Sequence, residues 1–129
     1  MFVGSFATGT LDLADIAALP ATGYAYTRTS AFVHELVEQW EKQINKKPFI
    51  VAHKEALRAE YGITTSYRFD YDESKYNFET HIGSVTFKYR RVSKITKDGK
   101  QQIERKIVTQ VFSIKAGNIL KIKETEQDD

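Results

Sequence analysis

The pattern of apolar and polar positions predicts one long helix followed by a series of strands. In residues 30–45, apolar side chains recur three or four positions apart, and glutamates fill the opposite side. Six residues make this stripe: Phe32, Val33, Leu36, Val37, Trp40 and Ile44. A period of 3.6 residues is typical of an amphipathic helix, for which Thr29 or Ser30 is a suitable N-cap and Pro48 a stop. We expect Trp40, in the middle of the stripe, to be buried against a sheet.

Residues 63–124 alternate between apolar and polar side chains, which predicts an antiparallel β-meander. The alternation changes parity at Gly83, as a β-bulge in a bent strand would make it do. Asp98-Gly99 is a strong hairpin signal. A three-residue loop over 98–100 would pair Ile95 with Ile103, and the glycine turn at 116–118 would close the last hairpin.

Three shorter elements are expected before the meander. Residues 11–19 form a short helix capped by Thr10, residues 48–52 a possible edge strand, and residues 53–62 a short helix that ends at Gly62. The sequence thus predicts an α+β fold in which one long helix packs on a bent antiparallel sheet. We divide the chain into an N-terminal arm (1–29), an α+β domain (30–125) and an acidic tail (126–129).

The order of these elements resembles that of the NTF2-like (SnoaL- or cystatin-like) superfamily over about residues 30–125. The ending "VFSIKAGNILKIKE" looks like the closing hairpin of that group, carried here by Phe112, Ile114, Gly117 and Ile119. "HKEALRAEYG" similarly stands where the group has a short pocket-closing helix. The resemblance implies a curved sheet folded into a cone around a helix, often dimeric through its open face. It implies no single function, since the group includes isomerases, dehydratases, binding domains and assembly hubs. The 29-residue arm departs from the common pattern, as does the short segment between helix and meander.

The composition of the 129 residues bounds the class of protein. The chain has the length of one domain, and its 41% apolar and 28% charged residues are ordinary for a soluble one. We expect no membrane span and no secretion signal, which places the protein in the cytoplasm or in a virion. Because the chain has no cysteine, it has no disulfide and no thiolate nucleophile.

Charge is segregated along the chain although the net charge is only +2. Lysine and arginine dominate residues 86–123, whereas residues 70–79 and the tail are acidic. The candidate binding residues on this basic hairpin are Lys88, Arg90, Lys94, Lys97, Lys100, Arg105 and Lys106. They favour docking of an acidic surface on a protein partner or a second copy, with nucleic-acid phosphates as the alternative.

The segment 103–115 is apolar on both of its faces. One helix covers only one side of a sheet, so the other side is wet, covered by the arm, or buried against another copy. We expect Val108, Phe112 and Ile114 to form an oligomer interface.

Catalytic and metal-binding signals are weak. His34-Glu35 on a helix is similar to the metalloprotease arrangement of two histidines four residues apart, but Glu38 occupies the second position. We therefore interpret His34 as solvated or at the edge of the stripe. His53 and His81 show no ligand-like spacing, so we assign no catalytic residue, no metal and no cofactor.

Two further readings follow from the same strands. An acid–base pocket of an isomerase or dehydratase would draw on Tyr67, Tyr71, His81 and Asp70 or Asp72. A DNA-reading helix-turn-helix over 54–68 is rejected, because the residues after Gly62 alternate as a strand. The preferred interpretation is a non-catalytic binding or assembly module, alone or in a multi-subunit particle.

Overall fold

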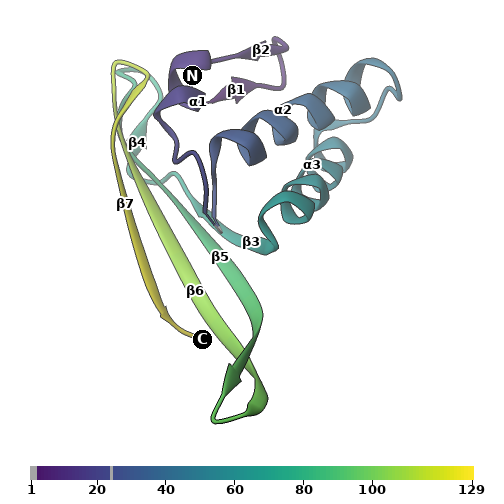
Figure 1. Ribbon diagram of the computed structural model, residues 1–129. Helices are drawn as coiled ribbons and strands as arrows, with labels where there is room; N and C mark the ends of the chain where they lie inside the picture. The colour runs from purple at the N-terminus through teal and green to yellow at the C-terminus, as the bar shows by residue number, and fades with distance from the viewer. Residues whose placement is uncertain (1–2, 24) are drawn as a thin grey trace.

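The computed structural model describes residues 3–23 and 25–129; residues 1, 2 and 24 of the expected arm lie outside this part. Over the described residues the chain forms three helices, a five-stranded antiparallel sheet and a small two-stranded sheet (Figure 1). The elements are β1 (Gly4–Ser5), β2 (Thr10–Leu11), α1 (Leu13–Ala18), α2 (Arg28–Gln43), α3 (Phe49–Thr64), β3 (Ser66–Asp72), β4 (Tyr76–Asn77), β5 (Ile82–Lys97), β6 (Lys100–Lys115) and β7 (Asn118–Asp128). The expected α+β class with an antiparallel sheet is confirmed. In the described ranges no helix has the length and apolar character needed to cross a bilayer.

The large sheet has the strand order β3-β5-β6-β7, and β4 pairs with the beginning of β5. Strands β5 and β6 are each 16 residues long, so their hairpin extends well beyond the helices (Figure 1). Helices α2 and α3 form a hairpin to one side of the sheet, and the arm with β1, β2 and α1 lies between that hairpin and the strands.

The turn between β5 and β6 has two residues, not the predicted three. Lys97 pairs with Lys100, and Asp98 and Gly99 both have positive φ, at 54° and 73°. Positive φ at both central positions belongs to a type I′ turn, whose twist matches that of the strands. The predicted register was therefore wrong by one residue, and Ile95 lies opposite Gln102 instead of Ile103.

Gly83 is not a bulge between β5 and β6, because the pairing of these strands is continuous there. Its φ is 141°, and a Cβ at this position would lie 2.1 Å from the carbonyl oxygen of Lys75. Glycine is thus required by the close approach of the chain entering β4. The register shifts of the sheet occur at Arg68/Asp70 and at Ser113/Ile114.

Local capping sets the helix starts. Thr27 caps α2: its hydroxyl accepts from Ser30 N at 3.3 Å, and Ser30 Oγ accepts from Thr27 N at 2.8 Å. The predicted cap at Thr29 or Ser30 was therefore two to three residues late. Asp12, not Thr10, caps α1. Residues 49–64 form one continuous helix, so the predicted edge strand at 48–52 was wrong.

The N-terminal arm, and not α2, fills the inner face of the sheet. Tyr26 packs edge-on against Phe87 at 5.0 Å and Phe112 at 6.2 Å between ring centroids. Buried Asp15 anchors the arm, since its carboxylate accepts from Val3 N at 3.0 Å and from Ile119 N at 3.1 Å. Among the described residues of the arm, five belong to the apolar core: Val3, Ile16, Leu19, Ala25 and Tyr26.

Val108, Phe112 and Ile114 lie in this core, with at most 3% of each side chain exposed. They are therefore not available on the surface of the chain, contrary to the expected oligomer interface. The arm covers that face of β6. On the other face Ile107 and Val111 are half-buried and Ile103 is exposed.

The apolar stripe of α2 faces outward, contrary to prediction. Trp40 is 59% exposed and Leu36 48%, so neither packs on the sheet. The inner side of α2 carries buried polar residues instead. Because the arm already occupies the inner face of the sheet, the stripe does not pack there.

This orientation predicts a small stability effect at Trp40. We expect Trp40→Ala to lower the free energy of unfolding by less than about 1 kcal/mol, as for an exposed position. Phe112→Ala, which opens a cavity in the core, should cost about 3–5 kcal/mol. Urea denaturation followed by circular dichroism measures both. Equal losses would mean that α2 packs through its stripe after all.

Candidate metal centre

The buried side of α2 presents chemically active groups. His34 and Glu38 lie one helical turn apart on the same face, and Glu35 lies beside them. Helix α3 packs along α2 and contributes His53 from its first turns and buried Glu60 from two turns further on. Five polar side chains from two helices, including two imidazoles, thus converge under the arm.

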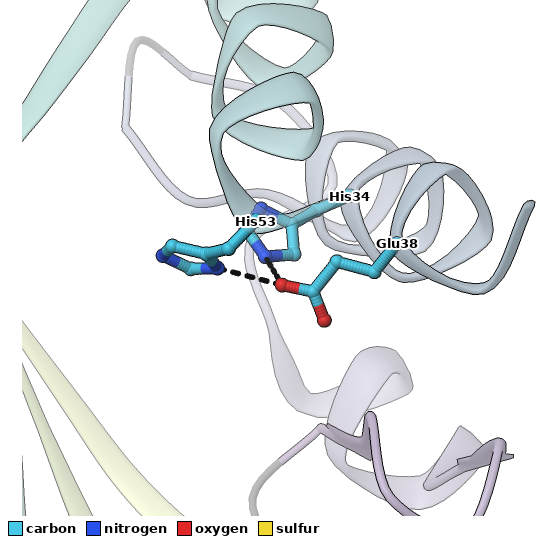
Figure 2. Close-up of side chains that lie close together, drawn as sticks. All are labelled: His34, Glu38 and His53. Atoms are coloured by element: carbon cyan, nitrogen blue, oxygen red, sulfur yellow. Dashed lines mark hydrogen bonds and ion pairs between the residues drawn. The ribbon is translucent and has the colours of Figure 1, made fainter. Parts of the chain in front are cut away.

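Two histidines contact the same carboxylate oxygen. His34 Nε2 lies 2.9 Å and His53 Nδ1 lies 2.6 Å from Glu38 Oε2, as Figure 2 shows. The three potential ligand atoms all lie within 4.8 Å of one another. Bonds from a zinc ion to such ligands are about 2.0–2.2 Å long, so small side-chain rotations suffice to place one ion between them.

A second carboxylate holds His34 in the orientation that a metal ligand requires. Glu60 Oε2 lies 2.9 Å from His34 Nδ1, which leaves Nε2 directed at Glu38. Glu60 itself is fixed by the Tyr89 hydroxyl at 2.5 Å and by Arg68 Nη2 at 3.3 Å. Carboxylates behind ligating histidines fix the tautomer and the ring plane in metal sites.

His53 is supported by aromatic rings. It stacks on Phe49 with 5.0 Å between centroids, and Phe49 in turn meets Phe6 of the arm edge-on at 5.2 Å. The arm therefore reaches the cluster through these rings.

Glu35 is the chemically least satisfied group of the cluster. Its side chain is buried, yet in the described part of the chain no group donates a hydrogen bond to its carboxylate. It opens onto a cavity of about 420 Å³ that His34, Glu38 and His53 also line. Gly4 of the arm approaches so closely that a Cβ there would lie 2.6 Å from Glu35 Oε2. Burial raises the pKa of Glu35 to about 7.

The pKa values of the other ionisable groups in the cluster are shifted by burial and by their hydrogen-bond and charge partners. Burial would raise the pKa of Glu38, but hydrogen bonds from His34 and His53 outweigh it and lower the pKa to about 2. Burial would likewise raise the pKa of Glu60, which the charge of Arg68 and the bond from His34 lower. For His34, burial acts to lower the pKa, and the bonds to both glutamates raise it on balance. The cluster thus keeps two ionised carboxylates inside the protein.

The interpretation of His34 as a solvated side chain was wrong, since only 3% of the residue is exposed. The second imidazole of the cluster, His53, was missed because residues 48–52 were assigned to a strand. On a continuous helix that returns along α2, a histidine 15 residues after Glu38 lies opposite it. The pairing of "HELVE" with a histidine at the start of the next helix was the available signal.

The expected binding residues lie elsewhere. Arg90 pairs with Asp129 at 2.7 Å and Lys106 with Asp128 at 2.5 Å, so the acidic tail neutralises part of the basic hairpin within its own chain. Lys94, Lys97, Lys100 and Arg105 are exposed along the projecting hairpin, and Lys88 is half-buried.

The expected acid–base pocket is not assembled as predicted. Tyr71 lines the cavity at Glu35 and also a second cavity, and His81 lines only the second. Tyr67, Asp70 and Asp72 are exposed and line neither cavity.

Comparison with protein-family models, with curated proteins and with solved structures finds no match to this chain. The resemblance to NTF2-like proteins stays a prediction.

Proposed function

We propose that this protein is a metal-dependent hydrolase whose ion is held by His34, Glu38 and His53. The observation that carries the proposal is the convergence of these three side chains, with ligand atoms within 4.8 Å, beside an unpartnered carboxylate on one cavity. Two imidazoles and one glutamate are a common ligand set of catalytic zinc. Magnesium and calcium prefer all-oxygen sites, so zinc fits this donor set better.

The balance of buried charge supports a cation. The cluster buries the carboxyl groups of Glu35, Glu38 and Glu60 against one permanent positive charge, that of Arg68. Buried carboxylates are costly unless they are paired or bind a metal. With Glu35 ionised, as a general base must be, a divalent cation would bring the three carboxylates and one guanidinium to electrical balance.

Glu35 is placed to act as the general base. When bound, a zinc ion supplies Lewis-acid activation of water for attack on a carbonyl group. Glu35 would accept the proton that the attacking water loses. The same carboxyl group would then donate that proton to the leaving group. Water is consumed, one bond to the carbonyl carbon breaks, and no oxidant or reductant is needed.

Metal binding is the first test. We expect one zinc ion per chain after dialysis against excess zinc and gel filtration, measured by inductively coupled plasma mass spectrometry. His34→Ala and His53→Ala should weaken zinc binding by about tenfold or more, because each removes a ligand. His81→Ala is the matched control and should bind as the unmodified chain does. Equal zinc binding by all four proteins would overturn the site.

Removal of the base should separate binding from turnover. We expect zinc-loaded Glu35→Gln to keep its zinc while kcat for hydrolysis of an activated ester or amide falls by about 10²–10⁴-fold. Glu41→Gln, on the same helix but outside the cavity, is the control. Unchanged turnover in Glu35→Gln would assign the proton transfer to another group.

Binding through the basic hairpin stays a second candidate. What supports it is the exposure of Lys94, Lys97 and Lys100 at the hairpin tip, outside all the ion pairs formed by the described residues. Because the tail is already engaged in its own chain, we favour nucleic acid over the tail of a second copy as the occupant.

A salt titration tests this candidate. If the tip binds duplex nucleic acid, log affinity should fall with log salt by about 0.9 per phosphate neutralised. Changing Lys94, Lys97 and Lys100 together to Ser should flatten that slope by up to about 2–3. An altered oligomeric state in the triple variant would instead favour docking of a protein. Fluorescence anisotropy and light scattering measure the two effects, and no change in either would remove the candidate.

A further inference from the structure

A second cavity, of about 480 Å³, adjoins the one that contains the candidate metal centre. Gly4, Tyr71 and Glu73 line both cavities, so they form the partition between the two. The Tyr71 hydroxyl donates a hydrogen bond to Glu73 across this partition. The two cavities therefore share one wall, and a molecule that extends past this wall would place one group at the candidate ligands and another in the second cavity.

The wall of the second cavity is largely aromatic. Tyr76 and Phe78 meet edge-on with 4.9 Å between centroids, and buried Val85 lies beside them. Phe78 is 61% exposed although its ring already has one partner. An aromatic surface of this kind binds another ring or a large aliphatic group by contact and by displacing water.

The loop that carries this wall is held in one conformation. His81 N donates to the Asn77 carbonyl at 2.8 Å, and Gly117 N donates to the His81 carbonyl at 3.2 Å. Asn77 Oδ1 accepts from Glu79 N at 2.9 Å and from Thr80 N at 3.1 Å. The backbone of His81 is kept at a φ of 57°, which is uncommon for a residue other than glycine. The second cavity is thus preformed, as binding pockets usually are.

The charges around both cavities restrict the substrate. Glu35, Glu38 and Glu73 line the two cavities, and the guanidinium of Arg68 is already paired with Glu60. With the ion bound at Glu38, the carboxylates of Glu35 and Glu73 would still repel the negative charge of a phosphate or sulfate ester. The fitting substrate is a neutral carbonyl compound with a large apolar group close to the bond that is cleaved.

We propose that the second cavity is the subsite for an aromatic or large aliphatic side chain of a polypeptide substrate. The peptide bond next to that side chain is hydrolysed at His34, Glu38 and His53. Polypeptide is the substrate class because each of its residues offers a neutral carbonyl group and many carry an apolar side chain beside it. Water adds across the bond: the carbonyl carbon gains oxygen, the C–N bond breaks, and the amine leaves with a proton. This inference rests on the proposed hydrolase function.

Cleavage of a peptide mixture tests the subsite. Zinc-loaded protein is incubated with an equimolar library of unstructured decapeptides, and the products are sequenced by mass spectrometry. Aromatic and large aliphatic residues should be enriched at one position beside the cleaved bond. An activated ester is assayed in parallel as a substrate that does not need the second cavity.

Phe78→Ser should lower kcat/KM for the preferred peptides about 10–100-fold, mostly through KM, with a smaller loss for the ester and the same zinc content. Tyr67→Ser is the matched control, since Tyr67 is an exposed aromatic residue that lines neither cavity. The unchanged zinc content also shows that the Phe78 variant is folded.

Each outcome separates the two proposals. Peptide cleavage without side-chain preference, or with the same preference in Phe78→Ser, overturns the subsite and leaves the hydrolase. Ester hydrolysis without peptide cleavage overturns polypeptide as the substrate class. Bound zinc without turnover of either substrate overturns both proposals.

Discussion

The packing of the N-terminal arm on the sheet determines the rest of the structure. Tyr26, Leu19 and Ile16 supply the apolar surface that covers the inner face of β5 and β6, and Asp15 ties the arm to β7 through Ile119 N. With that face taken, α2 cannot bury an apolar stripe on the sheet. It turns His34, Glu35 and Glu38 inward, under the arm, and this orientation creates the candidate site.

Glu60 then connects the two helices to the strands. It interacts with His34 of α2, with Arg68 of β3 and with Tyr89 of β5. In a buried network of this kind, loss of one partner leaves the others with unpaired polar groups, which costs more than the single bond contributes. The positions of His34 and of Glu38, one turn further along, are therefore set by the whole sheet, which is the support that a precise site needs.

The sequence predicted the location of α2 and the antiparallel meander because both depend on local periodicity. It did not predict which side of α2 faces inward. The 3.6-residue period distinguishes an apolar from a polar face of α2, but it does not show which part of the protein covers each face. The core residues of the arm recur without a regular spacing, so no pattern indicated that the arm packs on the sheet. Ile50 and Val51 are β-branched residues that favour a strand, and the packing of α3 on α2 overrides this preference. Because residues 48–52 were predicted as a strand, His53 was not expected on a helix that packs along α2, and the cluster with His34 was not predicted.

The orientation of α2 is the reverse of what stability alone favours. Leu36 and Trp40 are in water while three carboxyl groups are buried, although apolar burial is worth about 25 cal/mol per Å² and buried charge is costly. Natural sequences depart from consistent patterning mainly at functional sites. The side chains turned inward by this departure include His34, Glu38 and the unpartnered Glu35, and in the proposed hydrolase these, with His53, would bind the cation or move a proton. A purely structural role would account for the paired groups, but it would not account for Glu35, whose carboxylate opens onto the cavity without a donor from the described residues.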